Sequence, residues 1–200
     1  MMIIKKNLKY LLYNFIVPLM RIFFSIFFEK KYLCGKYYDN NLTGWKWAWR
    51  SLIWQKIFGF NRHIPWPVSP FIVISNPKNI YFNVNDLNNF QAFGNYFQNF
   101  KGKITIGEGT YIAPNVGLIT VNHDINNPDS YLDGKDIIIG NNCWIGMNSM
   151  ILPGIILGDH TIVGASSVVT KSFPEGNSII AGNPAKEIRN LQKNSKTIYI

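Results

Sequence analysis

Cysteine is scarce in this sequence, with only Cys34 and Cys143 among 200 residues. Two cysteines cannot build a disulfide framework, and their scarcity is compatible with a reducing cytoplasm. Neither cysteine has a second cysteine or a histidine at metal-ligand spacing, so we expect no zinc site and no metal requirement. Apolar residues make up 47 % of the chain, which is sufficient for the core of one or two domains.

Acidic residues are also few, and their shortage is confined to one end of the chain. Residues 1–63 hold eleven Lys and Arg but two Asp and Glu, whereas residues 64–200 hold nine of each kind. The neutral balance of residues 64–200 argues against a nucleic-acid groove, so no nucleic-acid partner is predicted. A basic, apolar and aromatic-rich segment fits an anionic membrane surface better than DNA.

An uninterrupted apolar run is missing from the N-terminal segment. The stretch from Leu11 to Phe28 is broken by Pro18 and Arg21, and no small-residue cleavage site follows, so it is not predicted to be a signal peptide. On a helical wheel its polar residues form one narrow stripe. The stripe consists of Asn7, Asn14, Pro18, Arg21, Ser25 and Glu29. We expect residues 8–28 to lie in or re-enter a membrane interface; helix packing within an oligomer and a true span remain alternatives.

Tryptophan and basic residues alternate in the next segment, Trp45-Lys46-Trp47-Ala48-Trp49-Arg50. This composition suits the headgroup region of a membrane, although a packing helix with solvated cations would have the same composition. Prolines at 65, 67 and 70 end any helix. Residues 1–70 are therefore predicted to be an amphipathic, aromatic helical extension.

An aliphatic residue recurs at every sixth position further along the chain. The series is Ile106, Ile112, Leu118, Ile139, Ile145, Ile151, Leu157, Val163 and Val169, with Ile74 and Ile80 as earlier hints. A period of six is typical of stacked coils in which each hexad supplies a strand and a corner, with the aliphatic residue inside. Positions four later are mostly small, as a narrow interior requires. They are Thr110, Val116, Cys143, Ser149, Thr161 and Ser167, so Cys143 is predicted to fill the core.

A loop interrupts the hexads at residues 124–138, directly after His123. Loops on a rigid scaffold are where catalytic residues usually lie. The other histidines are predicted to have no part in the chemistry: His160 lies at a solvent-facing corner and His63 in a connector.

The stretch from Ile104 to Arg189 carries a series of motifs in a fixed order. They are Ile112-Ala113-Pro114-Asn115-Val116, Asn122-His123-Asp124, Cys143-Trp144-Ile145-Gly146, Ile151-Leu152-Pro153-Gly154, Val163-Gly164-Ala165, Val168-Val169-Thr170-Lys171 and Ala181-Gly182-Asn183-Pro184-Ala185-Lys186. This series resembles the hexapeptide-repeat acyltransferases, in particular the galactoside, maltose and capsular-polysaccharide O-acetyltransferases. The resemblance implies a mainly β fold, a left-handed parallel β-helix over residues 71–181, followed by a cofactor-binding tail over 182–200. It also implies a homotrimer with acetyl-CoA between neighbouring prisms.

His123 matches the family's catalytic histidine. A sugar hydroxyl is a poor nucleophile at neutral pH, and a histidine can take its proton and later protonate the leaving thiolate. A backbone N–H from a neighbouring coil would stabilise the oxyanion, and no acyl-enzyme is needed. Asp124 is predicted either to orient the imidazole or to start the loop by bonding its own backbone. Trp144 matches an aromatic residue beside acceptor and cofactor, or is an exposed residue of the trimer contact.

The resemblance also implies cofactor contacts. These positions are Met147, Ala165, Thr170, Lys171, Lys186 and Arg189. Lys186 and Arg189 could hold the phosphates of coenzyme A through charge-assisted hydrogen bonds, or they could be solvated surface charges. The metal-binding carbonic-anhydrase branch of the fold needs several converging histidines, which this chain does not supply.

The acceptor is predicted to be a sugar of a cell-surface glycan, such as capsule or lipopolysaccharide, or its lipid-linked precursor. The N-terminal extension would then place a bacterial cytoplasmic enzyme at the inner face of the membrane. A small soluble acceptor (a free sugar, an antibiotic or a nucleotide-linked amino sugar) and a non-catalytic trimeric scaffold are the alternatives. The candidate sugar-binding residues are Asn85, Asn95 and Asn122, and the first two could equally be corner or loop residues.

Overall fold

The computed structural model describes residues 12–191. The chain divides into two compact units, with the boundary between Pro70 and Phe71. Several predicted features lie outside the described residues. These are the stripe residue Asn7, the first residues of the predicted 8–28 segment, and residues 192–200 of the predicted tail.

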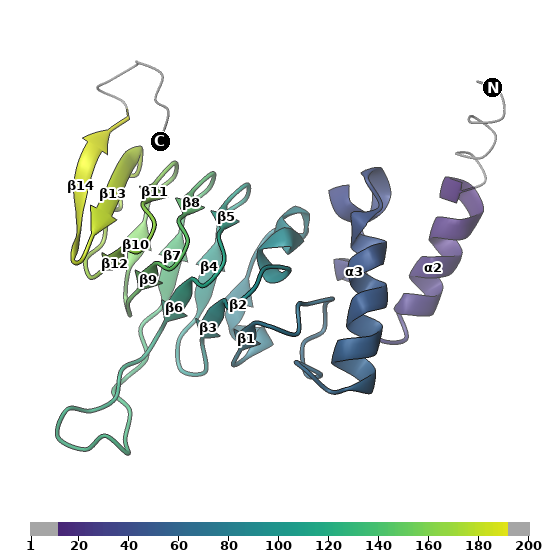
Figure 1. Ribbon diagram of the computed structural model, residues 1–200, viewed down its shortest axis with the longest axis horizontal. Helices are drawn as coiled ribbons and strands as arrows, with labels where there is room; N and C mark the ends of the chain where they lie inside the picture. Colours follow the sequence, from purple (N-terminus) through teal and green to yellow (C-terminus); the bar gives the residue numbers. More distant parts are fainter. Residues whose placement is uncertain (1–11, 192–200) are drawn as a thin grey trace. The chain divides into compact units, whose positions relative to one another are not determined.

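The first unit is helical, with α2 (Val17–Phe24) and α3 (Thr43–Ser51) as its main elements (Figure 1). Shorter helical turns cover Leu12–Ile16, Lys30–Tyr32, Lys36–Asn40 and Leu52–Ile57. Pro18 lies in the first turn of α2, directly after the helical turn Leu12–Ile16. Over residues 12–191, no helix combines the length and the apolar character that crossing a bilayer requires.

Aromatic packing joins the helices of this unit. The ring of Phe24 is fully buried, and its centroid lies 5.9 Å from that of Trp45 and 5.0 Å from that of Trp49. Arg21 forms an ion pair with Asp39, and its Nε donates to the carbonyl of Leu33 at 2.9 Å. Part of the polar stripe predicted on α2 therefore binds other segments of the same unit.

The second unit consists of three sheets, which successive strands visit in turn from β3 to β12 (Figure 1). The strands are β1 (Val73–Ile74), β2 (Ile80–Tyr81), β3 (Tyr96–Gln98), β4 (Ile104–Ile106), β5 (Tyr111–Ile112), β6 (Gly117–Ile119), β7 (Ile137–Ile139), β8 (Trp144–Ile145), β9 (Met150–Ile151), β10 (Ile156–Leu157), β11 (Ile162–Val163), β12 (Val168–Val169), β13 (Ser178–Gly182) and β14 (Ala185–Asn190). The sheet orders are β1-β3-β6-β9-β12, β10-β7-β4-β2 and β14-β13-β11-β8-β5. All described pairs are parallel except β13 with β14. These parallel sheets are typical of a hexapeptide β-helix.

The hexad residues occupy the interior, as predicted. Ile106 pairs with Ile139, and Leu118 pairs with Ile151, so the pattern stacks in register from coil to coil. Every aliphatic member of the series from Ile106 to Val169 is at most 6 % exposed. Burying each such side chain contributes about 1.5–3 kcal/mol. Cys143 is 1 % exposed, which confirms its predicted place in the core.

The corners of the coils require a left-handed backbone conformation. Asn115, Asn142 and Asn148 have φ values of 59°, 53° and 61°, and asparagine tolerates this region better than most residues. His160 takes the same conformation, with φ of 57°, and is exposed at its corner as predicted.

Two predicted boundaries differ from the structure. The loop predicted over residues 124–138 ends at Asp136, because Ile137 already belongs to β7 and pairs with Ile104 of β4. The predicted start of the tail at residue 182 falls at the end of β13, which pairs with β14 as an antiparallel hairpin. Short helical turns over Pro77–Asn79 and Val84–Phe90 occupy the region between β1 and β3, where the hexad pattern is weak.

Candidate active site

His123 lies where the chain leaves the coil after β6, at the base of the long loop visible at the lower left of Figure 1. It is exposed and forms an antiparallel bridge with Tyr131 on the returning side of the loop. Its Nδ1 lies 2.6 Å from the carbonyl oxygen of Pro128. Because a carbonyl oxygen can only accept, Nδ1 carries the proton in the neutral ring. The lone pair is therefore on Nε2, which is the atom available to act as a base.

The imidazole also packs, with its plane tilted by 38°, against an aromatic ring that the sequence did not single out. The ring centroids of His123 and Tyr131 are 4.3 Å apart. Phe100 meets Tyr131 edge-on at 5.0 Å, and Lys101 Nζ lies 3.4 Å from the carbonyl oxygens of Tyr131 and Leu132. Tyr131, Phe100 and Lys101 thus support the loop beneath the histidine. They lie outside the hexad pattern, and nothing in their spacing connects them to His123.

Asp124 bonds within the loop. Its Oδ1 accepts a hydrogen bond from the backbone N–H of Asn126 at 2.8 Å, and its own N–H donates to the carbonyl of Ser130 at 3.0 Å. This is the turn-forming contact that was one of its two predicted roles. The contact that orients the imidazole comes instead from the carbonyl of Pro128.

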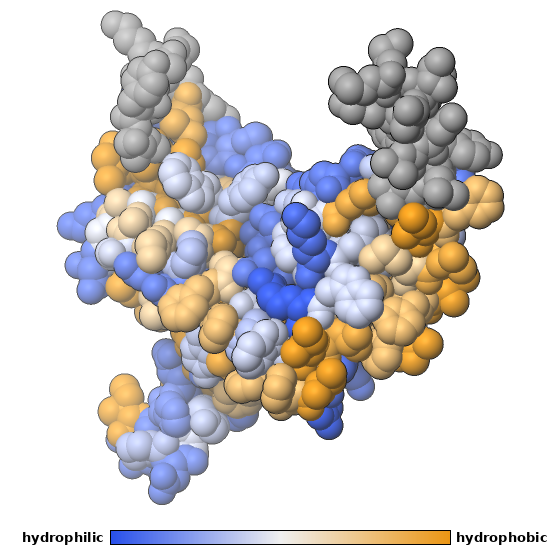
Figure 2. Space-filling model, turned by 45° about the vertical axis from the view of Figure 1, so that its right-hand side comes forward, coloured by the Kyte–Doolittle hydropathy of each residue, from blue (hydrophilic) through white to orange (hydrophobic). Residues whose placement is uncertain are grey.

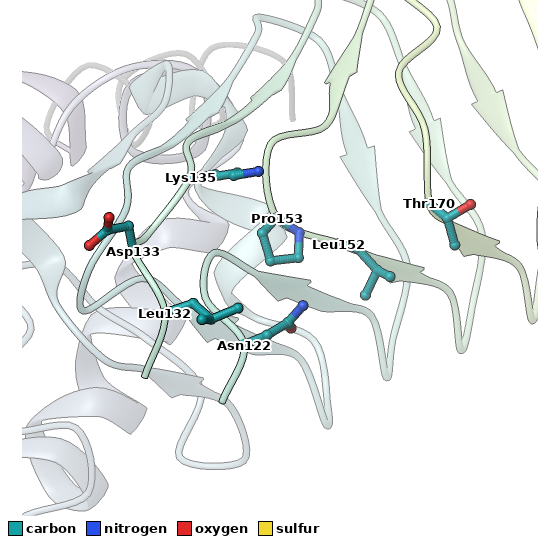
Figure 3. Close-up of a pocket in the computed structure, with 7 residues that line it drawn as sticks. All are labelled: Asn122, Leu132, Asp133, Lys135, Leu152, Pro153 and Thr170. Atoms are coloured by element: carbon teal, nitrogen blue, oxygen red, sulfur yellow. The ribbon is translucent and has the colours of Figure 1, made fainter. Parts of the chain in front are cut away.

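A cavity of about 320 Å³ lies beside the base of the loop (Figure 3). Its lining residues are Asn122, Leu132, Asp133, Lys135, Leu152, Pro153 and Thr170. Asn122 follows β6, Leu152 follows β9 and Thr170 follows β12, and these three strands are neighbours in one sheet. The structure therefore brings together Asn122 and Thr170, which the sequence assigned separately to acceptor and cofactor. Two lining residues from the loop, Asp133 and Lys135, add a carboxylate and an ammonium group.

Trp144 lies on a different sheet from the strand that precedes His123. It is 47 % exposed on β8, in the sheet that also contains β5 and β11. With Gly109, Tyr111, Asn142 and Cys143 it lines an apolar hollow of about 490 Å³. Within the described part of one chain, no contact joins Trp144 to His123.

The other cofactor candidates fall into three places. Met147 and Ala165 are exposed at consecutive corners after β8 and β11, where the carbonyl of Met147 accepts from the N–H of Ser166 at 2.8 Å. Lys171 follows Thr170 after β12, and its Nζ lies 5.5 Å from the ring centroid of Phe173. Lys186 and Arg189 lie on β14, opposite Ala181 and Ile179 of β13.

Asn95 requires a correction. Its side chain is 1 % exposed, and its Oδ1 accepts from the backbone N–H of Val116 at 3.1 Å. A side chain enclosed by the coil and bound to its backbone cannot contact a sugar, so we withdraw Asn95 as an acceptor ligand. Asn85 is half-buried in the turn Val84–Phe90, where its N–H donates to Asn83 Oδ1 at 2.9 Å.

The buried Cys143 is not a candidate nucleophile. Burial raises the pKa of the Cys143 thiol, so that this group stays protonated and unreactive. Among residues 12–191 there is no cluster of three or more His, Cys, Asp or Glu side chains that could hold a metal ion.

Known proteins resemble this chain in both sequence and structure. Residues 136–171 match the family model described as bacterial transferase hexapeptide (six repeats). The putative acetyltransferase C18B11.09c of Schizosaccharomyces pombe is 32 % identical over 148 residues, covering 72 % of this chain and 68 % of the relative. The putative colanic acid biosynthesis acetyltransferase WcaF of Escherichia coli is 40 % identical over 88 residues, covering 44 % of this chain and 48 % of the relative.

A solved galactoside acetyltransferase in complex with coenzyme A is 28 % identical, with a TM-score of 0.59, and the match covers 84 % of this chain and 88 % of that one. The chain spans 62 % and 60 % of the length of two further curated relatives. The hexads buried in register, the interrupting loop at His123 and these similarities lead to one conclusion. The chain belongs to the hexapeptide-repeat acetyltransferase family.

Proposed function

We propose that this protein transfers an acetyl group from acetyl-CoA to a sugar hydroxyl of a cell-surface glycan or its lipid-linked precursor. The observation that carries the proposal is the exposed imidazole of His123, whose Nδ1 is held by Pro128 so that Nε2 is the basic atom. Family membership supports acetyl-CoA as donor, since a relative of similar fold was solved with coenzyme A. The name of the colanic acid relative supports a glycan acceptor.

In the proposed reaction, His123 acts as a general base and then as a general acid. Nε2 takes the proton of the acceptor hydroxyl as its oxygen attacks the thioester carbonyl. The C–S bond then breaks, and the imidazolium returns the proton to the departing thiolate. The Nδ1–H···O=C bond to Pro128 stabilises the imidazolium that forms between these steps. Transfer is direct, without an acyl-enzyme or a required metal.

The proposal includes a left-handed coil and a homotrimer. His123 and Trp144 belong to different faces of one prism, so a site containing both needs a second chain. Exposed apolar side chains on the sheet faces, among them Tyr111 and Trp144, would be covered in such an assembly. In this arrangement Met147, Ala165, Thr170 and Lys171 line the donor groove, and Lys186 and Arg189 meet the phosphates of coenzyme A. Asn122 and Asn85 remain the candidates for acceptor contacts.

Residues 1–70, 71–181 and 182–200 are proposed as helical extension, acyltransfer domain and cofactor-binding tail. A cytoplasmic location at the inner face of the membrane is part of the same proposal, because the basic and aromatic extension suits a lipid surface. The name of the solved galactoside acetyltransferase favours the second candidate, a small soluble sugar as acceptor.

Coenzyme A release tests the proposal. Purified protein with acetyl-CoA is expected to release coenzyme A with lipid-linked or polymeric glycans and to show only background release without acceptor. Release of coenzyme A with small sugars alone would support acetyl transfer but would make a small soluble sugar the acceptor in place of a glycan. No release of coenzyme A above background with a broad panel of glycans, sugars and amines would contradict acetyl transfer.

Tyr131 is expected to position His123 for this reaction. Replacing Tyr131 with leucine removes the ring that stacks on the imidazole, so we expect kcat to fall about tenfold through misplacement of the base. The KM for acetyl-CoA should stay unchanged, and Tyr131→Phe, which retains the ring, should have nearly full activity. Steady-state kinetics on the two variants makes the comparison; equal losses in both would contradict a role for stacking.

A further inference from the structure

The helical unit exposes an apolar face along α2. Leu19, Ile22 and Ile26 are 65 %, 67 % and 74 % exposed, although Phe24 between them is fully buried. Leu19 and Ile22 lie three residues apart on one side of α2, and Ile26 follows in the turn directly after the helix. Large aliphatic residues at such exposure on one face are uncommon when nothing covers them.

The apolar face continues onto α3 and the turn that follows it. Phe23 and Trp49 are 41 % and 50 % exposed, and their ring centroids lie 5.8 Å apart. Beyond Trp49, further exposed apolar residues follow at helical spacing. They are Ile53, Trp54, Ile57 and Phe58. We call the exposed residues of α2, α3 and these turns the apolar patch; Figure 2 shows apolar side chains gathered over the helical unit.

A cavity with two cationic groups borders this patch. It has a volume of about 290 Å³ and is lined by Pro18, Arg21, Ile22, Ser25 and Lys30. Arg21 is held in place by Asp39 and by the carbonyl of Leu33 at 2.9 Å. Lys30 is an exposed lining residue, so the cavity presents one cation held by protein groups and one exposed to solvent. Ile22 belongs to both the cavity and the apolar patch, which places the cations at the edge of the apolar surface.

We propose that the helical unit docks on an anionic phospholipid surface, with the apolar patch in the interfacial region and a lipid phosphate in the Arg21–Lys30 cavity. An interfacial helix combines an apolar face with flanking cations in this way, and tryptophan suits the headgroup level. Charge favours a lipid over a second copy of the chain. Residues 12–63 hold eight basic and two acidic residues, so two such units would repel each other while each attracts anionic headgroups.

Docking deepens the membrane location included in the proposed function by naming the surface and the lipid group, and it rests on that function only where a lipid-linked acceptor is concerned. The binding itself needs neither acetyl-CoA nor His123. Vesicle binding and coenzyme A release can therefore fail independently, and a His123→Asn protein should still bind vesicles like the wild type.

Co-sedimentation of the full-length protein with vesicles tests the proposal. Vesicles of phosphatidylcholine alone are compared with vesicles containing phosphatidylglycerol, at low and high salt. We expect binding to the anionic vesicles that weakens with salt. Lys30→Gln should reduce the partition coefficient about fivefold, the effect of one cation at an anionic surface. The double variant Leu19→Ser, Ile22→Ser should reduce it at least tenfold, because two apolar side chains no longer insert.

Matched controls lie in the other unit. Ile125→Ser removes an isoleucine that is 92 % exposed, and Lys78→Gln removes an exposed lysine; both should bind vesicles like the wild type. Equal binding by the double variant and Ile125→Ser would overturn docking through the apolar patch. Equal binding to neutral and anionic vesicles, or no effect of Lys30→Gln, would overturn the phosphate cavity. Sedimentation equilibrium without vesicles gives a further check: a smaller oligomer in the double variant would assign the patch to an interface between copies instead.

Discussion

Replacing His123 with asparagine is expected to lower kcat/KM by about 1,000-fold, within the range that a positioned general base contributes. Asparagine keeps a polar side chain at the same exposed position but has no lone pair basic enough to take the hydroxyl proton. The turn made by Asp124 and Asn126 and the backbone bridge to Tyr131 do not involve the imidazole and should persist, although the imidazole contacts with Pro128 and the Tyr131 ring are lost. The measurement is coenzyme A release at saturating acetyl-CoA with an accepted sugar.

His160 supplies the matched control for this experiment. It is exposed, and its φ of 57° suits asparagine well. His160→Asn should therefore retain both fold and activity. If His123→Asn kept more than about a tenth of the wild-type rate, a general base at this position would be ruled out as the main source of catalysis. Equal losses in the two variants would point to a structural cause.

Replacing Gly107 with alanine is expected to destabilise the coil by about 3 kcal/mol. Gly107 follows β4, and the added Cβ would meet the carbonyl group of Gly140 and lie 2.5 Å from the backbone nitrogen of Asn141. These are backbone atoms of the next coil, so they cannot move without shifting the strands they connect. For a chain of this size the expected fall in Tm is about 10 °C, measured by circular dichroism.

Gly117 provides the comparison. An added Cβ there would meet the thioether of Met150, a flexible side chain that is 36 % exposed and can rotate away. Gly117→Ala should therefore cost less than about 1 kcal/mol. Melting of Gly107→Ala at the wild-type temperature would show that neighbouring coils do not approach as closely as the structure has them.

The repeating part of the fold could be predicted because its physics is local. Each hexad places one aliphatic residue inside, so the positions from Ile139 to Val169 could be assigned to the core without knowing where the coils lie in space. The interruption after His123 was recognisable for the same reason. The end of the loop was predicted two residues too late, because β7 begins at Ile137, before the hexad residue Ile139, with the exposed Ile138 between them.

The roles of side chains in the irregular segments were predicted less well from the sequence, and Asn95 shows why. Its residue type is common both in sugar sites and in structural turns. Only the position of Val116, on a neighbouring coil, decides that its amide oxygen accepts a backbone hydrogen bond inside the molecule. Arg21 is similar: the sequence places it on a polar stripe of α2, but its partner Asp39 lies in a separate turn.

The sequence alone determined that this chain is a hexad-repeat coil with a helical, basic extension and a histidine at the start of a loop. These features depend on residue type and spacing along the chain, which periodicity expresses directly. Tertiary structure alone decided that Pro128 and Tyr131 hold the imidazole, that Asn122 and Thr170 share one cavity, and that Arg21 and Lys30 border an exposed apolar patch. Each of these depends on how a loop, a coil or a helix folds in space, which the spacing of residue types along the chain does not record.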